Sequence, residues 1–189
     1  DPVSGNRSEQ IVKLNNGRWA VIMGNGVNSH NERPVLLIQY LDGGKELLRI
    51  IAHSTTGQSN GLSAPRPIDV NGNGTADIVY AGDLLGNVWK FNLTSTNAAN
   101  WGVSNYSGGT TLCKNATTCN PLFVAVDGSG NRQPVTAAPL WMAHPQGGIQ
   151  VLVGTGLNVT ASDRSNTSTQ SIYSVWDKGR YSSASGLVT

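Results

Sequence analysis

The sequence has few charged residues, few aromatic residues, only two cysteines and no long hydrophobic run. Charged side chains make up 13% of its 189 residues, and the 13 Lys and Arg are scattered, which excludes the basic stripe of a nucleic-acid-binding surface. No apolar run approaches the ~20 residues that cross a membrane, so we expect a protein that is not transmembrane. Disorder is excluded as well, because apolar segments such as VLLIQYL and IQVLVGTG recur along the chain.

Glycine is abundant instead, with 23 residues, and Ser, Thr and Asn are frequent. This composition favours a loop-rich all-β fold, and no convincing amphipathic helix is present. Alternating or continuous apolar runs between turn residues predict a series of short antiparallel strands. We expect a strand at 18–26, hairpins at 33–52, 76–93 and 121–141, and a strand pair formed by 149–156 and 170–179.

Three phrases, AVIMGNG, DIVYAGD and QVLVGTG, form an irregular internal repeat. Each is an apolar strand that ends at glycine and is followed, after an insertion, by a second apolar strand, as in the blades of a β-propeller. With four strands per blade, the length allows roughly three to four blades, which is too few to close most propellers. We therefore expect residues 1–189 to form one domain that is a fragment of a propeller or a partial propeller. A β-sandwich is the structural alternative.

The stretch DVNGNGTAD, residues 69–77, places oxygen-bearing side chains at alternate positions. Asp69, Asn71, Asn73 and Asp77 occupy loop positions 1, 3, 5 and 9, and Thr75 at position 7 offers its backbone carbonyl. Hard oxygen ligands at this spacing suit Ca²⁺. The sequence therefore predicts a calcium site with these five ligands.

The loop begins like an EF-hand but does not end like one, because position 12 is Tyr80 and not a bidentate Glu. A better match is the nine-residue D-x-[DN]-x-[DN]-G-x-x-D loop before a β-strand, in which Gly74 permits the sharp turn. Only two of the four side-chain ligands are charged, so we expect weak binding. The alternative interpretation is an Asx-rich turn without metal, since Asn-Gly pairs form turns unaided.

Other chemical signals are weak. GQSNG, residues 57–61, fits the G-x-S-x-G pattern around Ser59, but the prolines in LSAPRP prevent the helix that a nucleophile elbow requires. We expect no catalytic residues and no enzyme activity. Cys113 and Cys119 in LCKNATTCN predict a short disulfide loop and an oxidising compartment, with two free thiols as the alternative. The tryptophans in or beside strands are expected to pack in the core or between blades: Trp19, Trp89, Trp141 and Trp176.

The segment NGLSAPRPIDVNGNGTADIVYAGDLLGNVWKFNL, residues 60–93, resembles the C-terminal domain of the PilY family. These are type IV pilus biogenesis factors and tip-associated adhesins of Gram-negative bacteria. Further similarities follow in the family's order at 133–141, 152–159 and 168–179, so the resemblance covers most of the chain.

The resemblance implies a modified β-propeller with Ca²⁺ bound by Asp69, Asn71, Asn73, the Thr75 carbonyl and Asp77. It also implies an extracytoplasmic protein, at the pilus tip (fimbrium), the cell surface, the outer membrane or the periplasm. Pilins and minor pilins would be its partners, with host or abiotic surfaces as further targets. The function implied is support of pilus extension against retraction, twitching motility and adhesion. Asn73 departs from the more common Asp of the family, and no Arg-Gly-Asp tripeptide is present.

Two other classes share parts of the pattern. AGDLLGNVWKF, residues 81–91, is similar to repeats of quinone-dependent alcohol dehydrogenase propellers, but those enzymes use adjacent cysteines, and Cys113 and Cys119 are not adjacent. An integrin-like extracellular propeller would share the nine-residue calcium loop. The match of STQSIYSVWDKG, residues 168–179, favours the bacterial family.

Overall fold

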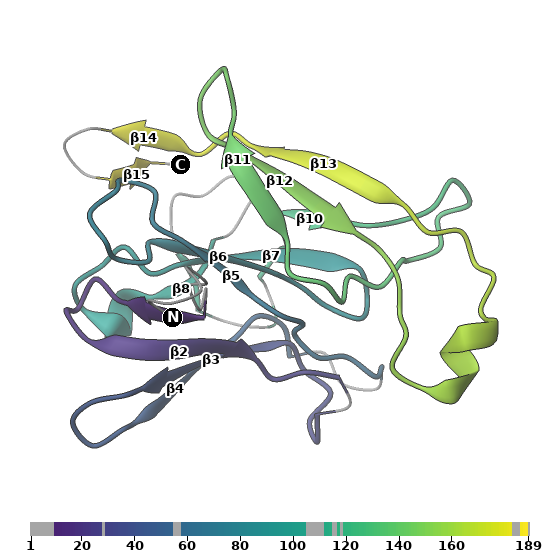
Figure 1. Cartoon of the computed structure of the whole chain (residues 1–189), viewed down its shortest axis with the longest axis horizontal. Helices are drawn as coiled ribbons and strands as arrows, with labels where there is room; N and C mark the ends of the chain where they lie inside the picture. Colours follow the sequence, from purple (N-terminus) through teal and green to yellow (C-terminus); the bar gives the residue numbers. More distant parts are fainter. Residues whose placement is uncertain are drawn as a thin grey trace, which may run out of the picture.

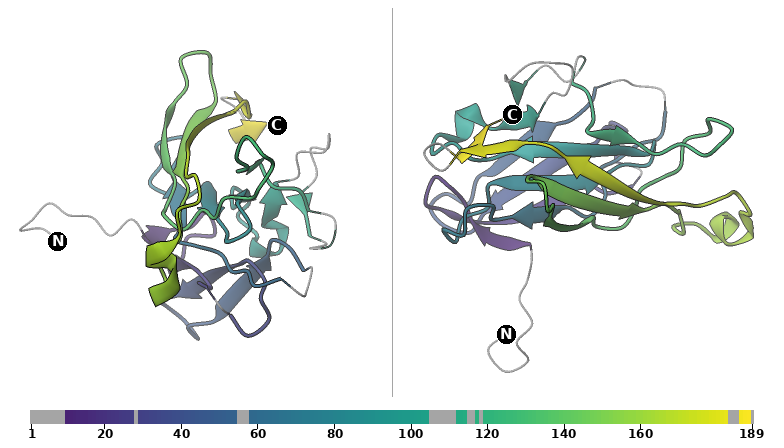
Figure 2. Two further views of the ribbon diagram at one scale, coloured as in Figure 1. Left: turned by 90° about the vertical axis from the view of Figure 1, so that its right-hand side faces the viewer. Right: turned by 90° about the horizontal axis from the view of Figure 1, so that it is seen from above.

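The computed structural model describes residues 10–27, 29–54, 58–104, 112–114, 117, 119–182 and 186–188, and side chains up to residue 179. Three antiparallel sheets lie side by side as successive layers, with a two-stranded ribbon beside the third (Figures 1 and 2). In the part of the chain that the structure describes, the sheets do not close into a ring. The all-β prediction of a partial propeller is thus confirmed. In the described part of the chain no helix is long and apolar enough to cross a membrane.

The first sheet is a four-stranded meander in which each strand pairs with its neighbour in sequence. Its strands are β1 (Ile11–Lys13), β2 (Trp19–Gly24), β3 (Val35–Tyr40) and β4 (Leu47–Ile51). Burial alternates along β3, where Leu36, Ile38 and Tyr40 are buried and their neighbours are not. One face of this sheet therefore packs on the core, and the predicted hairpin at 33–52 is confirmed.

The second sheet is the middle layer and carries the most specific part of the sequence. It contains β5 (Arg66–Ile68), β6 (Ile78–Gly82), β7 (Asn87–Asn92), β8 (Gly102–Ser104) and β9 (Leu112–Cys113) in that order. The two-residue β10 (Phe123–Val124) pairs with the beginning of β7. The predicted hairpin at 121–141 is confirmed only near its turn, where the antiparallel bridge Val126↔Arg132 and the hydrogen bond from Gln133 N–H to Ala125 O (3.0 Å) join the two arms around DGSGN. The strand β10 itself pairs with β7 and not with the second arm.

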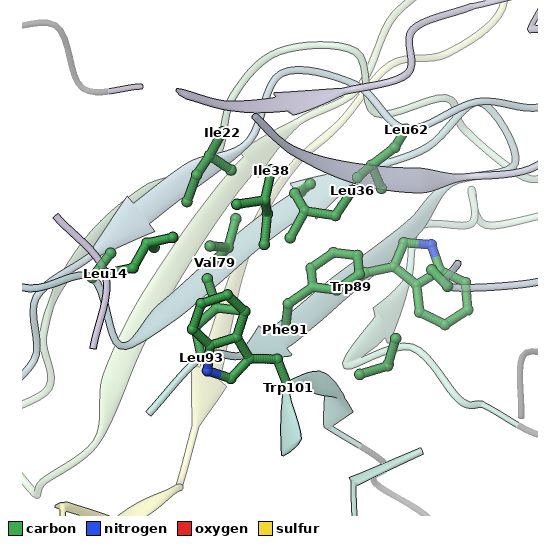
Figure 3. Close-up of a cluster of buried hydrophobic side chains, with 14 of the residues drawn as sticks. Leu14, Ile22, Leu36, Ile38, Leu62, Val79, Trp89, Phe91, Leu93 and Trp101 are labelled. Carbon is green, nitrogen blue, oxygen red and sulfur yellow. The ribbon is translucent and has the colours of Figure 1, made fainter. Parts of the chain in front are cut away.

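Strands β6 and β7 are buried on both faces because the middle layer is covered on both sides. Val79 and Phe91 belong to one hydrophobic cluster with Leu36 and Ile38 of the first sheet (Figure 3). Tyr80 and its neighbours on the opposite face belong to a second cluster, which they share with the third sheet. This double burial explains why IVYAG and NVWKF read as continuous runs of mostly apolar residues.

The third sheet consists of β11 (Leu140–Ala143), β12 (Ile149–Gly154) and β13 (Ile172–Asp177). β14 (Arg180–Ser182) and β15 (Gly186–Val188) form the separate ribbon. Two short 3₁₀ helices, η1 (Ala98–Asn100) and η2 (Ala161–Ser165), lie in connections. The predicted core role holds for Trp89, but Trp19 and Trp141 are 51% and 42% exposed, because each sits at a strand position that no described element covers.

A glycine ends the second strand of each sheet, and at two of these three positions it allows the next part of the chain to approach closely. A Cβ atom at Gly24 would lie 2.2 Å from the Ser63 carbonyl oxygen, and one at Gly82 would lie 2.2 Å from Val135 Cγ1. The third repeat position, Gly154, has no described atom within 4 Å of such a Cβ. The repeated glycine therefore marks the sheet-to-sheet junction at two of its three occurrences.

Candidate metal centre

The loop between β5 and β6, residues 69–77, wraps around the carboxylate of Asp69. Asp69 Oδ1 accepts hydrogen bonds from the backbone N–H groups of Gly72 (2.8 Å) and Asn73 (3.2 Å). Asp69 Oδ2 accepts one from Gly74 N–H (2.7 Å). Gly72 and Gly74 have φ angles of +74° and +85°, a backbone conformation that residues with a Cβ rarely adopt. The glycines thus permit the curvature that the sequence pattern predicts.

The next two oxygen-bearing residues form successive Asx turns. Asn71 Oδ1 accepts a hydrogen bond from Asn73 N–H at 3.0 Å. Asn73 Oδ1 accepts from Thr75 N–H at 2.8 Å and from Thr75 Oγ1 at 2.5 Å. Asn71 and Asn73 are exposed, and Thr75 is half-buried. The side-chain oxygens of Asn71 and Asn73 are therefore held against the backbone of the same loop.

Asp77 closes the loop and is the buried member of the set, at 3% exposure. Its Oδ2 accepts a hydrogen bond from Val70 N–H (3.0 Å), at the beginning of the loop. Its backbone N–H donates to Ile68 O (2.8 Å), and its carbonyl accepts from Leu93 N–H (2.8 Å). Both ends of the loop are therefore fixed to strands of the second sheet.

Asn15, which the sequence analysis missed, ties this loop to the first sheet. Its Nδ2 donates to Asp77 Oδ1 (3.0 Å), and its Oδ1 accepts from Thr75 Oγ1 (3.0 Å). Next to it, Ala76 N–H donates to Lys13 O (2.8 Å), as part of a parallel bridge between Leu14 and Ala76. No local pattern could have identified Asn15, because it lies 62 positions before Asp77.

The donor set fits a hard divalent cation. Asp69 and Asp77 offer carboxylate oxygens, and Asn71 and Asn73 each offer one amide oxygen. A carboxylate has about four acceptor positions, and the hydrogen bonds above occupy only some of them. In the described part of the chain no group of three or more His, Cys, Asp or Glu side chains gathers, and this loop contributes two carboxylates, Asp69 and Asp77. The five candidate ligands, Asp69, Asn71, Asn73, Thr75 and Asp77, lie on this one loop, and calcium binding by them stays a prediction.

The remaining chemical candidates have structural explanations. Cys113 and Cys119 form a disulfide, as the sequence predicts, and both are buried in the first hydrophobic cluster. Ser59 is followed by strand β5 and not by a helix, so the G-x-S-x-G pattern does not build a nucleophile elbow.

Comparison with known proteins identifies close relatives of this fold. A family model described as the PilY1 beta-propeller domain matches residues 5–189. Type IV pilus biogenesis factor PilY1 of Pseudomonas aeruginosa is 38% identical over 183 residues, which cover 93% of this chain but 16% of that protein. A PilY1 homolog of Xylella fastidiosa is 36% identical over 179 residues, 89% of this chain and 12% of that protein. The crystal structure of the P. aeruginosa PilY1 C-terminal domain superimposes with a TM-score of 0.78 at 34% identity, covering 95% of this chain and 38% of that one.

Proposed function

The chain belongs to the PilY1 β-propeller domain family, and from that premise we propose that it is a calcium-binding portion of a type IV pilus biogenesis factor. In this role the parent protein supports pilus extension against retraction, twitching motility and surface attachment. The function is non-enzymatic and depends on contacts with pilins or minor pilins at the pilus or cell surface. The observation that carries the proposal is the oxygen-lined loop 69–77 inside a PilY1-type sheet.

The loop residues do two things in this proposal. Asp69, Asn71, Asn73, the Thr75 carbonyl and Asp77 would hold Ca²⁺, which supplies the positive charge that balances the two carboxylates. Asp77 and Thr75 also contact Asn15, so an ordered loop supports the packing of the first sheet on the second. A ligand that binds only the folded loop stabilises this junction by mass action.

Calorimetric titration of the 189-residue chain with Ca²⁺, after treatment with a chelator, tests the proposal. We expect saturable binding at one site, and loss of this binding in Asp69→Ala. Asp127→Ala is the matched control, because Asp127 accepts similar hydrogen bonds from Ser129 and Asn131 N–H groups in another Asx-rich turn. Absence of saturable binding in the unsubstituted chain would contradict the metal site.

The biological half of the proposal needs the parent protein. We expect a bacterium whose parent protein carries Asp69→Ala to assemble fewer surface pili and to twitch less than one carrying Asp127→Ala. If deletion of the retraction motor restores pili in the Asp69→Ala strain, the defect lies in the ability of the parent protein to oppose retraction. Normal piliation and motility in the Asp69→Ala strain would contradict a role of this calcium site in pilus function.

A further inference from the structure

Asn15 lies in the turn between β1 and β2 of the first sheet, but its side chain contacts the candidate calcium loop of the second sheet. Its Nδ2 donates to Asp77 Oδ1 (3.0 Å) and to the backbone oxygens of Ala76 and Leu93 (3.1 Å each). Its Oδ1 accepts from Thr75 Oγ1 (3.0 Å). Because three acceptors surround Nδ2, the orientation of this amide is fixed by its neighbours.

The turn that carries Asn15 is held by contacts within the first sheet. Leu14 N–H donates to Arg18 O, and Gly17 N–H donates to Leu14 O, both at 2.8 Å. Leu14 has no exposed surface and belongs to the hydrophobic cluster that the first two sheets share. The backbone of Asn15 is therefore anchored on a rigid element, and a side chain held in this way can orient the groups that it contacts.

The two candidate ligands at the end of the loop, Thr75 and Asp77, take part of their support from Asn15. Val70 N–H donates to Asp77 Oδ2 (3.0 Å) and Asn15 Nδ2 donates to Asp77 Oδ1, so the two contacts together fix the plane of the carboxylate. The Thr75 hydroxyl lies between Asn15 Oδ1 (3.0 Å) and Asn73 Oδ1 (2.5 Å). Groups that orient the ligands of a metal from outside its coordination sphere contribute about 10–100-fold in metal affinity.

We propose that Asn15 is a positioning residue of the calcium site, and that docking of the first sheet on the second thereby sets the calcium affinity of the loop. This inference rests on the proposed calcium-binding function and adds a means of regulating it. Because coupling between two equilibria is reciprocal, calcium strengthens the junction of the two sheets by the same free energy that the junction contributes to calcium binding. Ala76 N–H, which donates to Lys13 O (2.8 Å), lies at this junction and reports on it.

Calorimetric titration of the 189-residue chain with Ca²⁺, after treatment with a chelator, compares Asn15→Ala with the matched control Asn16→Ala. Asn16 is the next residue of the same turn and is also half-buried, but its Nδ2 donates to Tyr40 OH (2.8 Å) within the first sheet. We expect Asn15→Ala to weaken calcium binding at least about tenfold and Asn16→Ala to leave it unchanged. Circular dichroism verifies that both variants are folded. An unchanged Kd in folded Asn15→Ala would leave Asn15 a structural role alone and overturn the proposal.

Hydrogen exchange under native conditions tests the reciprocal effect in the unsubstituted chain. Ca²⁺ should slow the exchange of Ala76 N–H by a larger factor than that of Val135 N–H, which donates to Asp83 O (3.0 Å) at the opposite end of β6. Equal slowing of the two amides would overturn the coupling to the first sheet.

The outcomes separate this inference from the proposed function. Calcium binding that is insensitive to Asn15→Ala overturns the inference and leaves the proposed function intact. Absence of saturable binding in the unsubstituted chain overturns both.

Discussion

Lys90 Nζ lies 2.6 Å from Asp177 Oδ2, and the two side chains are 0% and 1% exposed. Lys90 belongs to β7 of the second sheet and Asp177 ends β13 of the third, so this buried ion pair joins two layers of the fold. The hydroxyl of Tyr80 on β6 donates to the same Asp177 oxygen. A charge buried among apolar residues is tolerated only when a partner of opposite sign is in place, so the pair fixes how the two sheets dock.

Removal of either partner leaves an uncompensated buried charge. We expect Lys90→Met and Asp177→Asn each to lower the free energy of unfolding by about 3–5 kcal/mol. The double variant Lys90→Met/Asp177→Leu should lose less free energy of unfolding than the two single variants together, because no charge remains buried.

Urea denaturation measures the stability of all three variants, with Asp42→Asn as the control. Asp42 pairs with Arg18 at the surface, so this change should cost at most about 1 kcal/mol. A single variant as mild as Asp42→Asn would contradict a docking role for the pair.

The same pair predicts a dependence of stability on acid pH. Burial alone would raise the pKa of Asp177, but the Lys90 ammonium and the hydrogen bonds from Lys90 and Tyr80 lower it below its ordinary value of 3.8. The unfolded chain then binds a proton more readily than the folded one, so the stabilisation is present above about pH 4 and is lost as pH falls through the lower, folded pKa. Between pH 5 and pH 2.5, roughly, the unsubstituted chain should lose more stability than Asp177→Asn does. Parallel curves for the two proteins would contradict this assignment.

The repeated glycines predict opposite outcomes for one substitution at two equivalent positions. Gly82→Ala places a Cβ 2.2 Å from Val135 Cγ1 and 2.6 Å from its carbonyl oxygen, so we expect a loss of about 1–3 kcal/mol. Gly154→Ala meets no described atom within 4 Å and should be neutral or slightly stabilising in the 189-residue chain. Thermal and urea unfolding of both variants measure the difference. Equal stability of Gly82→Ala and Gly154→Ala would show that the junction at Gly82 is not tight.

The strands that could be predicted from the sequence are those whose burial is regular. β6 and β7 form continuous apolar runs because sheets cover both of their faces, and β3 alternates because one face is covered. The first arm of the hairpin expected at 121–141 contains β10, and its residues could not show that β10 pairs with β7. Likewise, hydrophobicity alone could not show that Trp19 and Trp141 lie on uncovered positions.

The turn at residues 69–77 could be predicted because the residues that form it are local in sequence, whereas the residues that support it could not. Asn15 reaches Asp77 from another sheet, and Asp83 collects its partners from segments up to 23 residues away. Lys90 and Asp177 read as ordinary polar residues in strands, and only the docking of the sheets makes them a pair. Side chains that act across sheets carry no local spacing, so sequence patterns do not reveal them.

The disulfide predicts sensitivity to reduction. Cys113 and Cys119 close a short loop, six positions apart, and cross-linking a loop of this size stabilises the folded state by about 2 kcal/mol through the unfolded chain. We expect a reducing agent to lower the free energy of unfolding by this amount. The variant Cys113→Ala/Cys119→Ala is the control and should be equally destabilised but insensitive to reductant. If reductant shifts the double variant as well, the effect does not come from this disulfide.

Asn73 offers a substitution that separates the metal from the loop. Asn73→Asp keeps an oxygen that can accept from Thr75 N–H and Oγ1 but adds a negative charge near Asp69. Without metal, repulsion between the two carboxylates should destabilise the chain slightly, by up to about 1 kcal/mol. With Ca²⁺, the third charged ligand should tighten binding on the order of tenfold. The sign of the stability change relative to the unsubstituted chain therefore reverses between EDTA and saturating Ca²⁺, which thermal unfolding in both conditions measures.

Asn166→Asp is the control. Asn166 is an exposed residue next to η2, so this variant adds the same charge far from the loop in sequence and should show no such reversal. A loop that is only an Asx-rich turn predicts destabilisation in both conditions, so the reversal discriminates directly between the two interpretations of DVNGNGTAD.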